Sequence, residues 1–271
     1  LGGGGRVAFV SNRQADGFFQ VWVMDVVQDD AGQILGINPQ QVTFSEGNKS
    51  NPSWSPDGTK LLYSGLSTGI ASNKKPFLDD IWMLDLTQPE AEPVDLTNKV
   101  GDDKYPAWSP NGKWIAWTSL GRDDQVPMLY IMNADGTEQR QLSTLVGERF
   151  AAWTLDSDYL MYVQIANDLK MLHMRDKFNS FLDDRKFDQF TVAGRLGLVW
   201  EPNVSLDGSM VAYSRIEGSR TNIFTAPFAD RGSVITQLTN SGTDATPFWS
   251  PDTKWLLFMT KRDGDEEIYI M

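Results

Sequence analysis

The sequence contains no cysteine and only one histidine, His173. Without thiols the chain forms no disulfides, offers no thiolate metal ligands and has no cysteine nucleophile. One imidazole is also too few for most zinc, manganese and iron sites in enzymes, which use several histidines. We therefore expect no transition metal and no cofactor, and we expect His173 to be an ordinary strand residue.

Long apolar runs and excess positive charge are also missing. No stretch approaches the roughly 18 apolar residues of a membrane helix, so we expect no membrane insertion. The net charge is −12, and such a surface repels phosphate backbones, which argues against nucleic-acid binding. The lack of cysteine suits an exported protein, and we expect a periplasmic or extracellular (cell-surface) location.

The sequence does contain a tryptophan-centred repeat. Its full copies are Pro52-Ser53-Trp54-Ser55-Pro56-Asp57-Gly58, Pro106-Ala107-Trp108-Ser109-Pro110-Asn111-Gly112 and Pro247-Phe248-Trp249-Ser250-Pro251-Asp252. Two weaker copies are Ala152-Trp153-Thr154-Leu155-Asp156 and Asn203-Val204-Ser205-Leu206-Asp207-Gly208. The copies recur every 45 to 54 residues. A period of roughly 40–50 residues made of short strands is typical of β-propeller blades.

Each repeat reads as four strands, A to D, with the tryptophan on strand A. Strands B and C occur six times and strands A and D five times, the first D strand being expected at 41–44. The predicted fold is all-β: a six-bladed propeller of four-stranded antiparallel blades, with incomplete terminal blades. The expected blades are 6–44, 45–97, 98–143, 144–192, 193–239 and 240–271 of a single domain.

Residues 1–5 are expected to be a linker or a processed start. Because the first blade lacks strand A and the last lacks strand D, we expect the sequence to be part of a longer protein. The alternative is a ring whose first and last blades have three strands.

The repeat motif itself is interpreted as architectural. Proline presets φ, aspartate bonds the local backbone and glycine accepts positive φ, so the residues after the tryptophan form a tight turn. The turn residues are Asp57, Gly58, Gly112, Asp207, Gly208 and Asp252. We expect the repeat tryptophans to be largely buried between blades: Trp54, Trp108, Trp153 and Trp249.

The Trp-Ser-Pro-Asp-Gly motif resembles the WD-repeat-like propeller repeats of the TolB family. Ser11-Asn12-Arg13, Met132-Asn133-Ala134-Asp135-Gly136 and Lys261-Arg262-Asp263-Gly264 are also similar to that family. The resemblance covers nearly the whole chain and implies a protein-binding propeller. It leaves a partnership with a peptidoglycan-associated lipoprotein as one of several options. Related repeats occur in propellers of tricorn-like and prolyl-oligopeptidase-like peptidases.

One motif suggests an enzyme. Gly65-Leu66-Ser67-Thr68-Gly69 matches the G-x-S-x-G nucleophile elbow, which requires a strand-turn-helix context and a nearby histidine. The segment is expected in a loop, far from His173, so we interpret the chain as non-enzymatic. The alternatives are an accessory propeller of a serine-hydrolase-type peptidase and a carbohydrate-binding propeller, for which Trp200-Glu201 is the only hint.

Acidic pairs suggest a binding surface. Three pairs are expected in the D–A and B–C loops of one rim: Asp79-Asp80, Asp102-Asp103 and Asp123-Asp124. We interpret them mainly as a solvated surface, with a rim for basic partners and an oxygen-only Ca²⁺ site as alternatives. Phe77-Leu78 beside Asp79 is the candidate anchor for another protein or another domain of the same chain.

Overall fold

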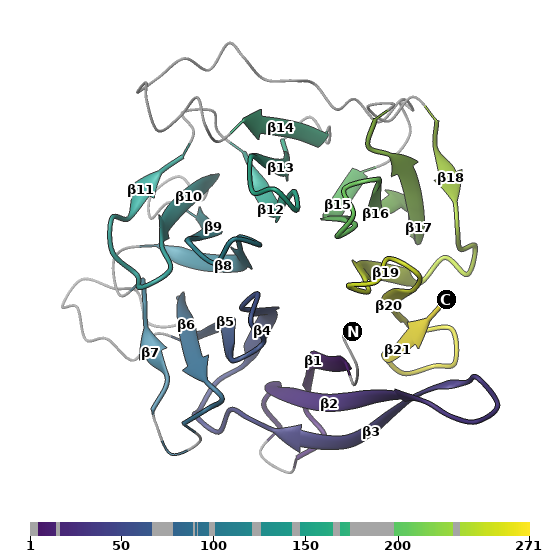
Figure 1. Cartoon of the computed structure of the whole chain (residues 1–271), viewed down its shortest axis with the longest axis horizontal. Coiled ribbons are helices and arrows are strands. Elements are labelled where there is room, and N and C mark those ends of the chain that lie inside the picture. The colour runs from purple at the N-terminus through teal and green to yellow at the C-terminus, as the bar shows by residue number, and fades with distance from the viewer. Residues whose placement is uncertain are drawn as a thin grey trace. The chain divides into compact units, whose positions relative to one another are not determined.

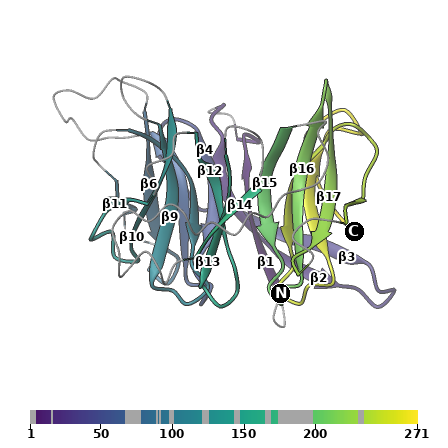
Figure 2. The same ribbon diagram turned by 90° about the horizontal axis from the view of Figure 1, so that it is seen from above.

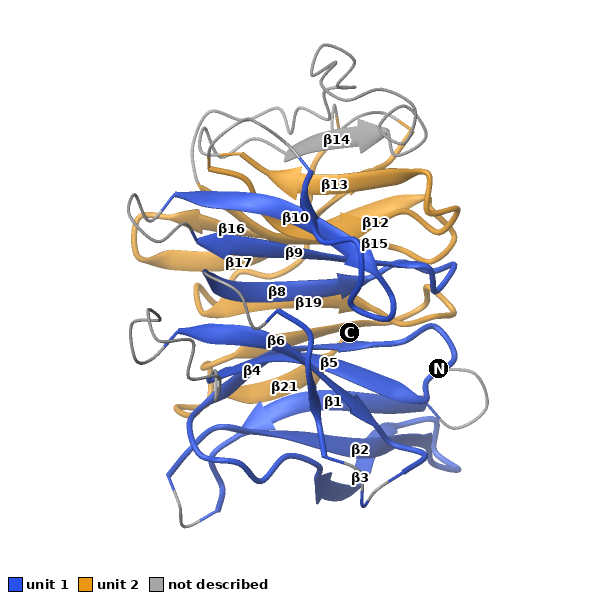
Figure 3. Cartoon of the chain, turned by 90° about the vertical axis from the view of Figure 1, so that its left-hand side faces the viewer, with its two compact units in different colours: residues 1–142 blue, residues 143–271 orange. Residues whose placement is uncertain are grey.

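The computed structural model describes residues 5–14, 17–66, 78–88, 90, 92–97, 101–120, 126–142, 147–164, 169–173, 198–229 and 234–271. The chain divides into two compact units, Leu1–Leu142 and Ser143–Met271. Figure 3 colours the two units separately. Each unit contains three antiparallel sheets.

Unit 1 begins with a three-stranded sheet and continues with two four-stranded sheets (Figure 1). The first sheet contains β1 (Gly5–Ser11), β2 (Gln20–Gln28) and β3 (Ile34–Gln41). The second contains β4 (Lys49–Trp54), β5 (Lys60–Leu66), β6 (Asp79–Asp85) and β7 (Val94–Asp95). The third contains β8 (Asp102–Trp108), β9 (Trp114–Leu120), β10 (Pro127–Asn133) and β11 (Arg140–Gln141).

Unit 2 has one four-stranded sheet between two three-stranded sheets in chain order. The fourth sheet contains β12 (Arg149–Trp153), β13 (Tyr159–Val163) and β14 (Leu169–His173). The fifth contains β15 (Leu198–Val204), β16 (Met210–Glu217), β17 (Arg220–Pro227) and β18 (Thr236–Gln237). The sixth contains β19 (Asp244–Trp249), β20 (Leu256–Thr260) and β21 (Glu267–Ile270).

The prediction of an all-β propeller with antiparallel blades is confirmed at the level of the sheets. Four strands per blade holds for three of the six sheets. Among the described strands, the first sheet lacks a strand A and the last lacks a strand D. The expected strand D of the fourth blade, at 190–192, lies outside the described residues.

The first strand D was placed wrongly. β3 spans Ile34–Gln41 rather than 41–44, and it forms a long hairpin with β2. The hairpin turn is closed by Asp29, whose Oδ1 accepts the N–H groups of Ala31 and Gln33 at 2.9 and 2.7 Å. Gly36 and Pro39 within β3 are poor strand formers, and they obscured the strand in the sequence.

Within each unit the core lies between the faces of successive sheets, whose strands are drawn in Figure 2. In unit 1, one cluster joins Val21 of β2 to Leu61 and Tyr63 of β5. A second joins the second and third sheets: Leu62, Ile81, Leu96, Ile115, Trp117 and Met132. In unit 2, Ala212 and Ile223 pack against Leu256 and Phe258.

Every strand A carries a β-bulge three residues before the tryptophan position. The pairing register with strand B shifts there in β4, β8, β12, β15 and β19. The bulged residues all have positive φ: Asn51, Tyr105, Phe150, Glu201 and Thr246. A bulge bends the strand and re-aims its side chains, so each strand A presents two differently directed segments.

Among the described residues, no helix is long and apolar enough to cross a membrane.

Candidate functional site

Two of the three acidic pairs expected on the rim, Asp79-Asp80 and Asp102-Asp103, lie in strands rather than in loops, which corrects their expected placement. Asp79 and Asp80 are the first residues of β6 and pair with the last residues of β5. Asp102 and Asp103 begin β8, opposite the last residues of β9. Aspartate is depleted in strands, so two in succession suggest a loop. Here each pair forms the first two residues of a strand instead.

Each pair has one buried and one accessible carboxylate, because side chains alternate along a strand. Asp80 is fully buried and Asp103 is 4% exposed, whereas Asp79 and Asp102 are half-buried. The expectation of a solvated rim was therefore wrong for Asp80 and Asp103. That Asp79 and Asp102 contact a partner stays a prediction.

One lysine joins the two accessible carboxylates. Lys104 Nζ lies 2.9 Å from Asp102 Oδ2 and 3.5 Å from Asp79 Oδ2. The Asp79 backbone N–H donates to Asp102 Oδ1 at 3.0 Å. Burial raises the pKa of Asp79, with Lys104 opposing and Asp102 adding to the rise. The two carboxylates share the ammonium group of Lys104, and Lys49 also interacts electrostatically with Asp79.

The buried Asp103 carboxyl is set apart by its environment. Burial raises its pKa to about 6, although hydrogen bonds with Ser119 and Thr97 favour the charged form. The negative charge of Asp80 adds to the rise. This carboxyl therefore takes up a proton in mildly acidic solution, which an exposed aspartate does not.

A buried lysine stands at the start of β4. Lys49 is 3% exposed, and its Nζ donates to the carbonyl groups of residues 45–47 at 2.8 to 3.2 Å. Burial lowers the pKa of Lys49, and the charge of Asp79 opposes this. The ammonium group thus holds the loop between β3 and β4 in one conformation.

That loop carries a phenylalanine that the sequence reasoning missed. Phe44 is 75% exposed, and Phe18, in the loop before β2, is 38% exposed. The two loops are joined because Phe19 N–H donates to Asn48 Oδ1 at 2.9 Å and Lys49 N–H donates to Phe19 O at 2.7 Å. The signal in the sequence is Phe44 followed by Ser45-Glu46-Gly47, but Phe44 is also the last residue of the strand expected at 41–44.

The remaining candidates are only partly described. Phe77, Asp123 and Asp124 lie outside the described residues, and Leu78 is half-buried. Of the G-x-S-x-G match, Gly65 and Leu66 belong to β5 and 67–69 are not described. His173 is the last residue of β14. In the part of the chain that the structure covers, no three His, Asp or Glu side chains are arranged to hold a metal ion.

The repeat residues form a recurring turn. In the second sheet, Ser55 Oγ donates to Asp57 Oδ1 at 2.6 Å, and Ser55 Oγ accepts the Lys60 N–H at 2.9 Å. Equivalent bonds occur in the other sheets with a strand A. Trp153 is 7% exposed, and Trp54, Trp108 and Trp249 are half-buried.

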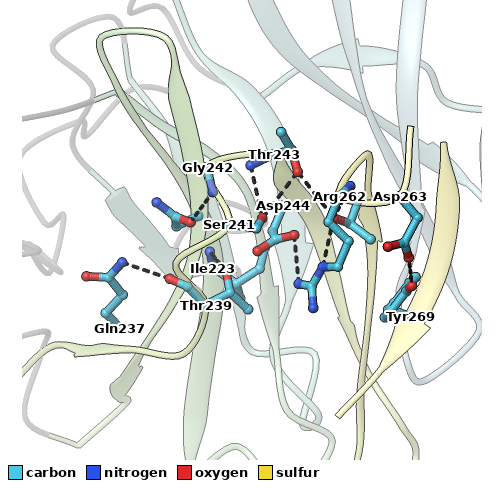
Figure 4. A network of polar contacts seen from close by, with 12 residues as sticks. Ile223, Gln237, Thr239, Ser241, Gly242, Thr243, Asp244, Arg262, Asp263 and Tyr269 are labelled. Atoms are coloured by element: carbon cyan, nitrogen blue, oxygen red, sulfur yellow. Dashed lines mark hydrogen bonds and ion pairs between the residues drawn. The ribbon is translucent and has the colours of Figure 1, made fainter. Parts of the chain in front are cut away.

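Unit 2 contains an ion pair between a buried carboxylate and an exposed arginine at the start of its last strand A (Figure 4). Asp244 is fully buried, and Arg262 Nη2 donates to Asp244 Oδ1 at 2.9 Å. Burial raises the pKa of Asp244, but hydrogen bonds from Ser241, Thr260, Arg262 and Thr239 outweigh it and lower the pKa to about 2. Asp244 is therefore ionised at neutral pH, and its pair with Arg262 joins the start of β19 to the end of β20.

The Trp200-Glu201 pair lies at the bulge of β15. Burial raises the pKa of Glu201 to about 7, opposed by the Thr246 backbone N–H. The Phe150 ring is 5.1 Å from the Trp200 ring, and the Arg149 guanidinium carbon is 4.9 Å from the Trp200 ring centre. Because Arg149 occupies a face of Trp200, the ring is not freely open for stacking on a sugar.

No family model matches the chain. It is 24% identical over 233 residues to the uncharacterized peptidase YuxL of Bacillus subtilis, covering 82% of this chain and 32% of that protein. It is 25% identical over 204 residues to the Tol-Pal system protein TolB of Francisella tularensis, covering 74% and 43% respectively. The chain thus spans less than half of the length of either relative.

Solved structures give the same picture of the fold. TolB from Acinetobacter baumannii superposes with a TM-score of 0.75 at 18% identity, covering 98% of this chain and 61% of that one. A putative TolB from Agrobacterium tumefaciens gives 0.69 at 19% identity, covering 86% and 80%. The chain has a TolB-like β-propeller fold, as the repeat motif indicated.

Proposed function

We propose that this chain is a non-enzymatic propeller that binds another protein, or another domain of its own protein, through one surface of unit 1. This surface, the rim patch, consists of Phe18, Phe44, Glu46, Asp79 and Asp102. An exposed aromatic side chain surrounded by charged groups is the usual composition of an interface anchor and its rim.

The observation that carries the proposal is the exposure of Phe44. A large aromatic side chain that is 75% exposed is costly to leave in water. Its loop is nevertheless held in place by the buried ammonium group of Lys49, through three backbone carbonyls. A pre-ordered loop loses little conformational entropy on association, so Phe44 is suited to insert into a partner's pocket.

The charge of the rim patch indicates a basic partner surface. Lys104 compensates only part of the charge of Asp79 and Asp102, and the chain as a whole carries −12. Rim charges mainly set the association rate and its dependence on salt. We place the protein in the periplasm or at the cell surface, which the similarity to TolB supports.

The architecture proposed with this function is a single domain over 6–271, in which the six sheets are the blades of one propeller. Loops on a rigid propeller vary without disturbing the sheets. The loop between β3 and β4 carries the exposed Phe44 and lies outside the pairing of β4 with β5.

The test uses a defined probe, the peptidoglycan-associated lipoprotein of a Tol-Pal system, because the relative from Francisella is named for that system. We expect Phe44→Ala to weaken binding about tenfold or more, as hot-spot truncations do, without lowering the melting temperature. Phe248→Ala is the matched control, since Phe248 is 52% exposed but lies on β19 of unit 2.

Equal binding by the wild type, Phe44→Ala and Phe248→Ala would rule out the rim patch as the binding surface. Absence of binding by the wild type would exclude this partner, and the comparison would then be repeated with proteins captured from the source organism. In this capture experiment, the proposal is supported by a protein that binds the wild type and the Phe248→Ala variant but does not bind the Phe44→Ala variant.

A second candidate is an accessory propeller of a peptidase. Support comes from YuxL and from dipeptidyl-peptidase 5 of Porphyromonas gingivalis, which is 36% identical over 76 residues, or 26% of this chain and 10% of that protein. A G-x-S-x-G elbow between a strand and a helix elsewhere in the same polypeptide favours this candidate. In that case the rim patch would contact the catalytic domain.

A further inference from the structure

Among the described strands, the β1 edge of the first sheet has no neighbouring strand, whereas the corresponding edge of every other sheet is paired with a strand A. In the other sheets a strand A pairs with strand B: β4 with β5, β8 with β9, β12 with β13, β15 with β16 and β19 with β20. β1, which is the strand B of the first sheet, pairs with β2 alone among the described strands. Unpaired backbone groups at a strand edge are a template for another strand.

The end of β1 reproduces the end of β20 in detail. The N–H and Nε of Arg13 donate to Ser11 Oγ at 3.3 and 3.0 Å. The N–H and Nε of Arg262 donate to Thr260 Oγ1 at 3.2 and 3.3 Å in the same way. A short side chain at the end of strand B therefore orients the arginine two residues later in both sheets.

The aromatic support of the two arginines is also the same. Arg13 Cζ lies 5.2 Å from the Phe9 ring centre and 4.9 Å from that of Trp22. Arg262 Cζ lies 5.3 Å from the Phe258 ring centre and 4.9 Å from that of Tyr269. Cation–π contacts of this kind fix the plane of the guanidinium group, so both arginines are held in one orientation.

The two arginines differ in what they bind. Arg262 donates to the carboxylate of Asp244, the first residue of the strand A that pairs with β20 (Figure 4). Asp244 stands five residues before Trp249. No carboxylate among the described residues pairs with Arg13, which is exposed. Arg13 thus has the support of an aspartate-binding arginine, and no described strand of its sheet carries the corresponding aspartate.

The sixth sheet gives the register of the missing strand. Trp249 and Phe248 stand opposite Leu256 and Leu257, and Asp244 stands opposite Thr260. Phe9 of β1 pairs with Trp22 in the way that Phe258 of β20 pairs with Tyr269. When β1 is aligned with β20 on these pairs, Leu256 corresponds to Val7, and Thr260 corresponds to Ser11. A strand docked in this register would place its tryptophan opposite Val7 and its aspartate opposite Ser11, beside Arg13.

We propose that the open edge of β1 and Arg13 together form a binding site for an extended peptide with the pattern Asp-x-x-Pro-x-Trp. The peptide adds antiparallel to β1, and its aspartate forms a charge-assisted pair with Arg13. The pattern is that of the third and sixth sheets, Asp103 to Trp108 and Asp244 to Trp249. Strand addition provides the affinity, and the aspartate and tryptophan provide the selectivity. The site does not depend on the rim patch.

The experiment measures binding of a labelled peptide, Thr-Asp-Ala-Thr-Pro-Phe-Trp-Ser-Pro-Asp, which copies residues 243–252, to the complete chain. A second peptide replaces the aspartate at the position of Asp244 by asparagine. We expect this change to weaken binding roughly tenfold, the effect of losing one hydrogen bond between charged groups. Arg13→Ala should weaken binding of the aspartate peptide by a similar factor and leave binding of the asparagine peptide nearly unchanged. The double-mutant cycle would then show energetic coupling between Arg13 and the aspartate of the peptide.

Two controls locate the effect. Arg220→Ala removes an exposed arginine of β17 and should leave both affinities unchanged, whereas Arg13→Lys keeps the charge and should restore part of the affinity. Amide exchange of residues 5–11 should slow when the peptide is bound. Equal affinity of the two peptides, no coupling with Arg13, or no binding by the folded protein would each overturn the proposal.

Discussion

At the residue scale, the turn after each tryptophan shows how one hydrogen-bond pattern accepts different residues. Gly58, Gly112 and Gly208 have φ of +68°, +71° and +70°. Ser157 and Thr253 occupy the same turn position with φ of +59° and +57°. A side chain at positive φ is strained, most of all a β-branched one. The fourth and sixth sheets therefore keep the turn at some cost in stability.

Replacing the strained threonine by glycine tests this reading. We expect Thr253→Gly to raise the free energy of unfolding by about 1 kcal/mol, because relief of strain exceeds the added flexibility of the unfolded chain. Gly58→Thr should lower it by a similar or larger amount. Urea unfolding monitored by tryptophan fluorescence measures both, and a destabilised Thr253→Gly variant would contradict the account.

The half-buried residue Glu201 predicts a pH effect. The folded-state pKa of Glu201 is raised to about 7. The neutral carboxyl therefore contributes to the free energy of unfolding below the unfolded-state pKa, and this contribution is lost as pH rises through about 7. From pH 5 to pH 8 the loss should be on the order of 2–3 kcal/mol. We expect Glu201→Gln to remove most of this decline, whereas Glu90→Gln, at an exposed position, should not. Denaturation curves at the two pH values decide the matter.

At the element scale, the strands that were predicted well are those with a simple burial pattern. Leu61, Ile115 and Val211 lie in B strands whose central residues are mainly apolar and are buried on both faces, and such runs are recognised without tertiary information. β3 was misplaced because its residues are mostly exposed and include glycine and proline. Its position depends on pairing with β2, which composition alone does not show.

The tryptophan of strand A links neighbouring sheets, and its removal should be costly. Trp108 packs against the cluster that contains Leu62, Ile81 and Ile115. Because its side chain is half-buried, we expect Trp108→Ala to cost about 2–4 kcal/mol, toward the lower end for tryptophan truncations. Chemical denaturation measures the loss. A change below about 1 kcal/mol, similar to that of surface substitutions, would show that the contact between sheets contributes little.

At the scale of the whole molecule, the candidate site was only partly predictable. The acidic pairs were correctly picked out as unusual, but the alternation that buries Asp80 and Asp103 requires knowing that β6 and β8 begin at these residues. Phe44 could not be identified as exposed, since one aromatic residue at the end of an expected strand is more often buried. Its exposure follows from the loop that Lys49 holds in place.

The net charge predicts how the protein behaves in solution. With a formal charge of −12 and an isoelectric point near 4.5, the chain should be most soluble above pH 6 and least soluble near pH 4.5, where repulsion between molecules vanishes. Turbidity measured across this pH range tests the expectation. A solubility minimum at neutral pH would indicate association through uncharged surfaces.

The hydrogen-bonded turn between strands A and B also affects how the chain reaches its native state. Each copy joins residues no more than five positions apart, as Ser55 and Lys60 are joined, so the loop that must close is short. Short loops close in well under a microsecond and cost little entropy. Five such hairpins distributed along the sequence give refolding several equivalent starting points. No single hairpin should then control the rate at which native structure first appears.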